Sequence, residues 1–82
     1  MKVSVIIPVY NEESTIEEIL RRVKAEEIAA EILVIDDGSN DGTREILENL
    51  DQDSQLRVIL HDRNRGKGAT VRTGFQNAAG EV

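Results

Sequence analysis

The sequence predicts an α/β fold built around an open parallel sheet, with elements in the order β-α-β-α-β-α. Short runs of β-branched and apolar residues alternate along the 82-residue chain with segments in which apolar residues recur at helical spacing. No repeat, low-complexity stretch or linker interrupts this alternation. Strands and helices in this order are typical of a Rossmann-like arrangement, in which right-handed helical crossovers join parallel strands. A chain of this length forms one small domain at most.

Three strands are expected in the sheet. Residues 3–7 are β-branched and nearly all apolar, which is typical of a strand buried on both faces. Pro8 cannot donate a ladder hydrogen bond, so we expect it to end this strand. Residues 32–35 and 56–60 form the second and third strands, and Glu81-Val82 would begin a fourth. Because the chain stops where this strand is expected, we interpret the sequence as truncated at its C-terminus.

Three helices are expected between and after these strands. Residues 14–17 have the pattern of a capping box, in which Ser14 and Glu17 satisfy free amides. Helical spacing then places four apolar residues on one face: Ile16, Ile19, Leu20 and Val23. A short second helix carries Ile46, Leu47 and Leu50. We expect Gly80 to end the third helix, whose packing side would hold Val71, Phe75 and Ala78.

Composition restricts the possible partners. The formal net charge of −6 argues against a nucleic-acid partner, although basic residues gather between Arg63 and Arg72. Cysteine is absent and the aromatic residues are Tyr10 and Phe75, so there is no thiolate metal site and little aromatic surface. The longest apolar stretch, residues 3–9, is far shorter than the ~20 residues that cross a bilayer. We therefore expect a soluble, cytoplasmic domain.

Polar and conformationally special residues follow all three expected strands. They occupy residues 8–12, 36–42 and 62–68, whereas the loops at 26–31 and 50–55 are plain acidic linkers. In an open parallel sheet, ligands bind beyond the carboxyl ends of the strands, where the strand order reverses. The sequence therefore predicts a binding site at this edge.

Single residues of these loops allow more than one interpretation. Successive strand residues point to opposite faces, so only one carboxylate of Asp36-Asp37 is expected to line the crevice. It would accept hydrogen bonds from ribose hydroxyls or a base N–H, unless the pair is simply part of a turn. Tyr10 could stack on a base or pack internally, and Glu12 could accept from a base or be solvated. His61 is a lone histidine at a strand end, and we assign it no role.

Basic residues surround two glycines where the third helix begins. Arg63, Arg65 and Lys67 flank Gly66 and Gly68. Cations and free amides at a helix N-terminus attract phosphate oxygens. The glycine spacing fits neither a P-loop nor a dinucleotide-binding fingerprint, so an ATPase and a classical dinucleotide-binding protein are disfavoured. A small-anion site is compatible with this segment, and the alternative is a solvated basic surface.

Three segments together resemble the family 2 glycosyltransferases of GT-A fold. They are Val3–Glu13, Val34–Thr43 and Asn64–Ala69, in the order that the family has them and across nearly the whole chain. The third segment, with Gly66-Lys67-Gly68-Ala69, is similar to the dolichyl-phosphate mannose synthase and polyprenyl-phosphate glycosyltransferase branch. The resemblance implies that residues 1–82 are the N-terminal nucleotide-binding portion of a catalytic domain with a truncated GT-A fold.

The resemblance also implies which residues contact the nucleotide. By this comparison, Pro8, Tyr10 and Glu12 line the base pocket, and Asp37, with Ile35 beside it, contacts the base or ribose. Arg65 and Lys67 belong to a basic loop near the nucleotide. The metal-binding Asp-x-Asp of the family is expected after the next strand, and the catalytic base further on. No catalytic residue and no metal ligand is therefore expected within residues 1–82.

For the intact enzyme, the resemblance implies sugar transfer from a UDP- or GDP-sugar to an acceptor such as a polyprenyl (dolichyl) phosphate. Mg²⁺ or Mn²⁺ would neutralise the diphosphate leaving group. The intact protein could then work at the cytoplasmic face of a membrane. This piece alone is expected to bind nucleotide weakly at best and without turnover.

Two other interpretations compete with this one. A receiver-like signalling domain needs a phosphoacceptor Asp at the end of a central strand, and the third strand here ends in His61-Asp62, which is a poor match. A non-catalytic α/β nucleotide-binding or scaffold module would fold without being part of an enzyme. An exposed sheet edge where the missing strand belongs would favour self-association of the chain.

Overall fold

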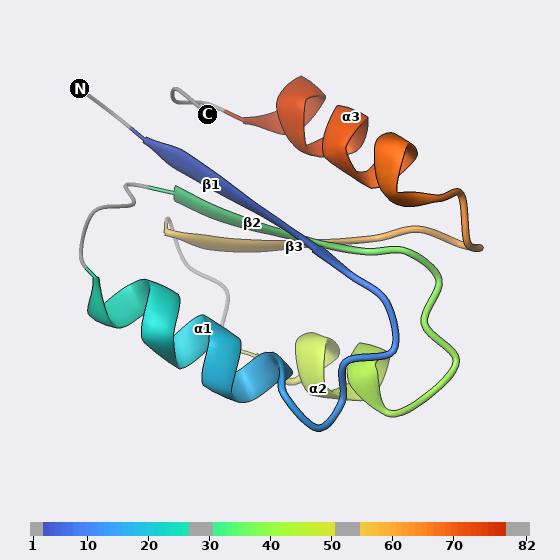
Figure 1. Cartoon of the computed structure of the whole chain (residues 1–82), viewed down its shortest axis with the longest axis horizontal. Coiled ribbons are helices and arrows are strands. Elements are labelled where there is room, and N and C mark those ends of the chain that lie inside the picture. Colours follow the sequence, from blue (N-terminus) through green and yellow to red (C-terminus); the bar gives the residue numbers. More distant parts are fainter. Residues whose placement is uncertain (1–2, 27–30, 51–54, 79–82) are drawn as a thin grey trace.

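The computed structural model describes residues 3–26, 31–50 and 55–78 and has the predicted alternation of strands and helices. The strands form a parallel three-stranded sheet in the order β1-β2-β3 (Figure 1). This confirms the α/β, Rossmann-like prediction and the order β-α-β-α-β-α. The elements are β1 (Ser4–Val9), α1 (Ile16–Ala25), β2 (Glu31–Asp36), α2 (Thr43–Glu48), β3 (Leu56–Leu60) and α3 (Lys67–Asn77).

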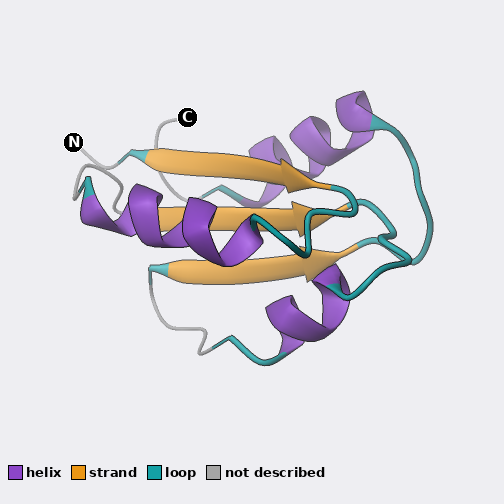
Figure 2. Cartoon of the chain, turned by 60° about the horizontal axis from the view of Figure 1, so that its bottom comes forward, coloured by secondary structure: helices purple, strands orange, loops and turns teal. Residues whose placement is uncertain are grey.

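The helices cover the two faces of the sheet unequally. Helices α1 and α2 lie on one face, and α3 lies on the other, where it packs against β1 and β2 (Figures 1 and 2). After β3 the chain therefore crosses to the opposite face and runs back over the sheet. None of the helices among the described residues is long and apolar enough to span a bilayer.

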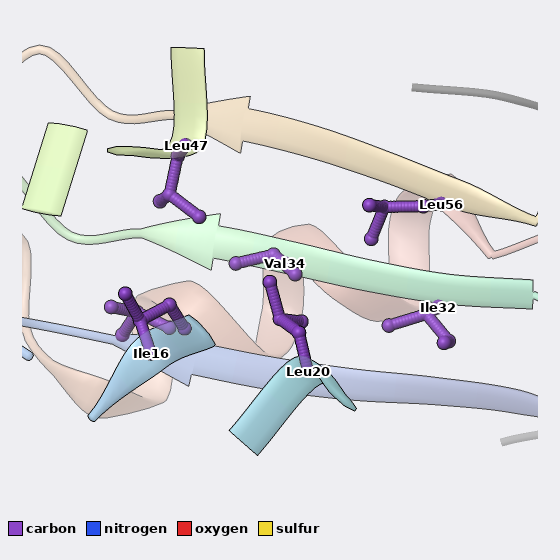
Figure 3. Packing of buried hydrophobic residues seen from close by; sticks show 7 residues of the cluster. Ile16, Leu20, Ile32, Val34, Leu47 and Leu56 are labelled. Carbon is purple, nitrogen blue, oxygen red and sulfur yellow. The ribbon is translucent and has the colours of Figure 1, made fainter. Parts of the chain in front are cut away.

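The main apolar core lies between the sheet and the helices α1 and α2. Ile16 and Leu20 of α1 are buried there, as their helical spacing predicts, while Ile19 and Val23 are half-buried. Burial of one such side chain contributes about 1.5–3 kcal/mol relative to exposure. Figure 3 shows how the residues from both helices and the strands meet: Ile16, Leu20, Ile32, Val34, Leu47 and Leu56.

The predicted capping box at the start of α1 is wrong. The helix begins at Ile16, and Thr15 occupies the N-cap position without a side-chain capping bond. The carbonyl oxygen of Glu12 accepts from the amides of Thr15 (3.0 Å) and Ile16 (2.8 Å), and the carboxylate of Glu12 accepts from the Thr15 hydroxyl (2.8 Å). Glu12, two residues before Ser14, therefore closes this turn.

Pro8 does not end the first strand, contrary to the prediction. Strand β1 continues to Val9, and Pro8 is paired in register with Ile35 of β2. Within the described sheet, β1 pairs with β2 alone. A proline is tolerated in such a strand when its nitrogen is not needed for the ladder.

The predicted packing side of α3 is correct only in part, because Val71 and Ala78 are half-buried but Phe75 is not. Its buried residues are Thr70 and Gly74, whereas Phe75 is 59% exposed. A Cβ atom added at Gly74 would lie 2.5 Å from Cγ2 of Ile6, so the helix approaches β1 through small residues. The ring of Phe75 is left outside this contact.

Helix α3 ends at Asn77, three residues before the predicted terminator. Ala78 has extended backbone angles, and its amide donates to the carbonyl oxygen of Gly74 at 2.9 Å. Arg57 of β3 donates to the carbonyl oxygen of Asn77 at 3.1 Å, which satisfies one of the free carbonyls at the helix end. Gly80 and the predicted strand at residues 81–82 lie outside the described residues.

Candidate functional site

The loops that follow the three strands lie at one edge of the sheet. In Figure 2 the three arrowheads point the same way and the loops gather beyond them. Parallel strands bring their carboxyl ends to a common edge, so residues distant in sequence become neighbours there. The site is built from these three loops and the start of α3.

Side chains after β2 hold the loop that follows β1. The Ser39 hydroxyl accepts from the amide of Asn11 (2.8 Å), and the Thr43 hydroxyl accepts from the amide of Glu12 (2.8 Å). In return, the side chain of Asn11 accepts from the amide of Asn40 at 2.9 Å. Asn11 has a φ of 52°, a left-handed conformation that asparagine tolerates better than most residues. The polar residues after β2 therefore act first as a scaffold for the β1 loop.

The two carboxylates at the end of β2 have different environments. Asp36 is fully buried, and its oxygens accept from the hydroxyl (2.5 Å) and the amide (3.1 Å) of Ser39. The guanidinium of Arg44 lies 3.8 Å from the same carboxylate. The Asp36 carboxylate thus has its partners inside the protein, whereas Asp37 lines a pocket. The expectation that only one of the pair lines the crevice agrees with this arrangement.

Asp37 holds the loop between β3 and α3. Its carboxylate accepts from the amides of Arg65 (2.8 Å) and Gly66 (2.9 Å), and Nδ1 of His61 lies 3.1 Å away. Burial alone raises the pKa of Asp37, but the Arg65 amide, the His61 ring and the Gly66 amide together lower this pKa below its ordinary value. Asp37 is therefore ionised near neutral pH and fixes where α3 begins.

Gly38 allows the β2 and β3 loops to touch through their main chains. Its φ is +75°, and a Cβ atom there would lie 2.4 Å from the carbonyl carbon of Arg63 and 2.5 Å from the amide nitrogen of Asn64. Any side chain would meet backbone atoms, which cannot move aside as a flexible side chain does. Only glycine fits this contact without displacement of one loop.

A pocket of about 380 Å³ opens at this edge. Its volume lies within the range of about 300–1,000 Å³ that is usual for small-molecule sites. Residues from β1, all three strand-end loops and α3 contribute to its wall: Pro8, Val9, Tyr10, Glu12, Asp37, Asn64, Gly66, Lys67 and Thr70. The three loops thus converge on one concave surface.

Five of the seven residues predicted to contact a ligand line this pocket: Pro8, Tyr10, Glu12, Asp37 and Lys67. Ile35 does not, because it is fully buried in the central strand. The side chain of Arg65 does not line it either, because its guanidinium pairs with Asp62 at 3.0 Å. Arg65 contributes its amide to Asp37 instead of a charge to the pocket.

Four lining residues were not predicted as site residues: Val9, Asn64, Gly66 and Thr70. Thr70 was missed because the buried positions of α3 hold a threonine and a glycine, which an apolar pattern does not mark. Gly66 has a φ of +93° and occupies the N-cap of α3, a role that its place before the helix could have indicated. Asn64 accepts from the Gly66 amide at 3.1 Å, so it shapes the same turn.

The pocket combines an aromatic ring, acceptors and a cation. Tyr10 is 43% exposed, so part of its ring is free to contact a flat ligand. Glu12 and Asp37 supply carboxylate oxygens, and Lys67 supplies an ammonium at the first residue of α3. Helix α3 has no side-chain cap, which leaves amides of its first turn without a helical partner. Within residues 3–26, 31–50 and 55–78, no three His, Cys, Asp or Glu side chains are grouped so that they could hold a metal ion.

Comparison with known proteins shows the family to which the chain belongs. The family model described as Glycosyl transferase family 2 matches residues 4–82. Curated relatives named undecaprenyl-phosphate 4-deoxy-4-formamido-L-arabinose transferase include those of Salmonella paratyphi A (44% identical), Salmonella paratyphi B (42%) and Salmonella choleraesuis (41%). Each match covers 99% of this chain and 27% of the relative, so the chain spans about a quarter of the relatives' length. The chain belongs to glycosyl transferase family 2.

Proposed function

We propose that residues 1–82 form the nucleotide-binding portion of a glycosyltransferase and bind the nucleotide of a UDP- or GDP-sugar. The observation that carries this proposal is the convergence of Tyr10, Asp37 and Lys67 on one pocket. These residues come from the β1 loop, the end of β2 and the start of α3. They offer, in that order, a ring for a base, an acceptor for a sugar hydroxyl and a cation for phosphate.

The base end of the nucleotide would lie against the β1 loop. Pro8 and Tyr10 line the pocket there, and the exposed part of the Tyr10 ring is available to a base. Stacking of a base on an aromatic ring is worth about 1–3 kcal/mol. The Glu12 carboxylate lines the same pocket and can accept from a base N–H. The Glu12 side chain also accepts from Thr15, which restricts its orientation.

The phosphate end would lie at the start of α3. Lys67 is the first residue of this helix and lines the pocket, so its ammonium and the free amides of the first turn both favour an anion there. Asp37 lines the same pocket, and its carboxylate has an acceptor position left for a ribose hydroxyl while it holds the loop amides.

The relatives' names support a polyprenyl phosphate as the acceptor of the sugar. In the whole protein, we propose transfer of a sugar from the nucleotide to this lipid phosphate at the cytoplasmic face of a membrane. A divalent ion, Mg²⁺ or Mn²⁺, would supply charge neutralisation to the leaving diphosphate. The described residues contain no group of side chains suited to hold this ion, so we propose no metal-dependent step for them.

The proposal is tested by titration of the isotope-labelled chain with UDP and with GDP, followed by NMR. We expect shifts that concentrate at Tyr10, Asp37 and Lys67, with one nucleotide binding more tightly than the other. Lys67→Gln should weaken binding at least tenfold, the size expected for loss of a charge-assisted contact of about 1.5–3 kcal/mol. Arg72→Gln is the matched control, because Arg72 lies on the same helix, is exposed and does not line the pocket.

Two outcomes would contradict the proposal. A folded chain with no spectral change at millimolar UDP or GDP would favour a scaffold module without a ligand. Equal weakening by Lys67→Gln and Arg72→Gln would show that net charge, and not this pocket, attracts the nucleotide.

The acceptor is tested by a chimera in which this chain replaces the matching portion of the Salmonella paratyphi A relative. Loss of lipid-linked sugar formation in a folded chimera would contradict the proposed acceptor.

Self-association through the outer edge of β1 stays a prediction. In the described sheet, β1 is an edge strand, and such strands offer main-chain groups to another chain. Sedimentation equilibrium of the chain should show a concentration-dependent increase in mass. A single monomeric species at all concentrations would contradict it.

A further inference from the structure

His61 is a buried residue next to the pocket but outside its wall. It follows β3 directly, and only 6% of it is exposed. Its main chain is held on two sides, because its amide donates to the carbonyl oxygen of Asp36 (2.9 Å) and its carbonyl oxygen accepts from Arg44 (2.8 Å). The main chain that carries the imidazole is therefore held by β2 and α2 together.

Both ring nitrogens of His61 have partners on other elements. Nδ1 lies 3.1 Å from Oδ1 of Asp37, and Nε2 lies 2.9 Å from the hydroxyl of Thr73. Because the Asp37 carboxylate is ionised, it can only accept, so Nδ1 carries the proton of this contact. Nε2 of the ring is then an acceptor, and the Thr73 hydroxyl donates its single proton either to Nε2 or to the carbonyl oxygen of Ala69, which lies 3.0 Å away. The ring thus joins the end of β2 to the second turn of α3.

This contact restricts the carboxylate that lines the pocket. A carboxylate offers about four lone-pair positions. Asp37 uses three of them, for His61, the amide of Arg65 and the amide of Gly66. Two of these donors belong to the turn before α3 and the third to a ring with a fixed main chain. Together they leave Asp37 one acceptor position and hold the carboxylate against rotation.

We propose that His61 is a positioning residue of the nucleotide pocket. It holds Asp37 in the orientation that accepts from the ligand, and through Thr73 it fixes α3, whose first residues contact the phosphates. This inference rests on the proposed function, since it assigns His61 a part in that same site. An apolar residue could fill the same volume, but it would leave Asp37 and Thr73 each without one hydrogen-bond partner.

The first experiment compares two substitutions at this position. His61→Leu keeps much of the volume and removes both ring nitrogens, whereas His61→Asn keeps a donor near the place of Nδ1. We expect His61→Leu to weaken UDP or GDP binding about tenfold, as for loss of a hydrogen bond to a charged group, and His61→Asn to restore affinity to within about threefold of the unmodified chain. Urea unfolding curves define conditions in which each variant is folded. Unchanged binding by folded His61→Leu, or no restoration by His61→Asn, would overturn the proposal.

The second experiment approaches the ring from α3 and covers the case in which His61→Leu fails to fold. Thr73→Val removes the hydroxyl near Nε2 with little change of shape, and Thr73→Ser is the matched control that keeps it. We expect weaker nucleotide binding by Thr73→Val only. Equal affinities of the two variants would show that the contact between His61 and Thr73 does not influence the pocket.

A third measurement needs no ligand. The amide of Arg65 donates to Asp37, so its hydrogen exchange reports whether the carboxylate is held in place. We expect faster exchange at Arg65 in His61→Leu and near-normal exchange in His61→Asn. If the unmodified chain binds no nucleotide, the proposed function fails while this measurement still tests the positioning role. Unchanged exchange at Arg65 in His61→Leu would overturn the role even if nucleotide binds.

Discussion

The two faces of the sheet are packed by different kinds of side chain. On one face, α1 and α2 contribute fully buried Ile16 and Leu47 to a continuous apolar core. On the other face, α3 contributes Thr70 and Gly74 to its contact with the sheet, and Phe75 stays exposed. The sheet buries apolar side chains on both faces, with Leu33 and Ile35 on the α3 side, but α3 itself meets the sheet through small residues at close approach and through polar contacts at the helix start. Hydrophobic periodicity therefore identifies a packing side only where large side chains make the contact.

Loss of a core side chain on the α1 and α2 face should have the largest effect. Leu47→Ala should lower the free energy of unfolding by about 2–5 kcal/mol, because it removes a fully buried side chain and leaves a cavity. For a chain with such a small core, this could remove most of its stability. Urea denaturation measures the change. Leu50→Ala is the control, since Leu50 is only half-buried, and equal losses would contradict the difference in packing.

Alanine substitution of two glycines in α3 should change the free energy of unfolding in opposite directions. Gly74→Ala should destabilise the chain by about 1–3 kcal/mol, because the new methyl group would overlap Ile6 and push the helix away from β1. Gly68→Ala has no atom within 4 Å of the new methyl group and should stabilise by up to about 1 kcal/mol through helix propensity. Thermal unfolding of both variants checks this pair. Stabilisation by Gly74→Ala would mean that the α3 contact is not close.

Acid should weaken the attachment of α3 before it affects the apolar core. Asp37 has a pKa below its ordinary value in the folded chain, so it stabilises the fold above the range in which a free aspartate titrates. That contribution is lost as the pH falls through the folded-state pKa. Asp37→Asn should therefore be clearly less stable than the unmodified chain near pH 7, and this gap should narrow toward about pH 3. If the urea midpoints of Asp37→Asn and the unmodified chain differ by the same amount at every pH, the ionic role of Asp37 is contradicted.

The smallest effect is expected at the residue that the sequence placed in the core. Phe75→Ser should change the free energy of unfolding by no more than about 0.5 kcal/mol, because the ring is more than half exposed and most surface substitutions lie within this range. Chemical denaturation of the variant measures it. A loss of several kcal/mol would show that Phe75 is covered, and that the two faces are more alike than the structure indicates.

The order of elements could be predicted because strands and the first two helices carry dense apolar patterns. Ile16 and Leu20 show this, since their spacing correctly predicted both a helix and its buried side. The side of α3 could not be predicted in this way, because the contact depends on the missing side chain of Gly74 and its distance from Ile6. Periodicity counts apolar atoms and does not register how closely two backbones approach.

The candidate site was only partly predictable for a similar reason. Loops that follow parallel strands meet at one edge, which was enough to bring Tyr10, Asp37 and Lys67 together. The sequence did not indicate that Asp37 holds the amides of a loop 28 and 29 residues away, or that His61 lies behind it. Such contacts depend on exact loop conformations, which a pattern of residue types does not encode. Arg65 illustrates the limit, since its side chain is paired with Asp62 outside the pocket.

The contact at Gly38 couples the two loops that frame the site. With main chain resting on main chain at this point, neither the segment after β2 nor the segment after β3 can be displaced alone. A ligand that shifts the turn ahead of α3 must carry the neighbouring loop with it, and through Ser39 the strain would reach Asn11. The loops after β1, β2 and β3 are thus expected to move together when a ligand binds.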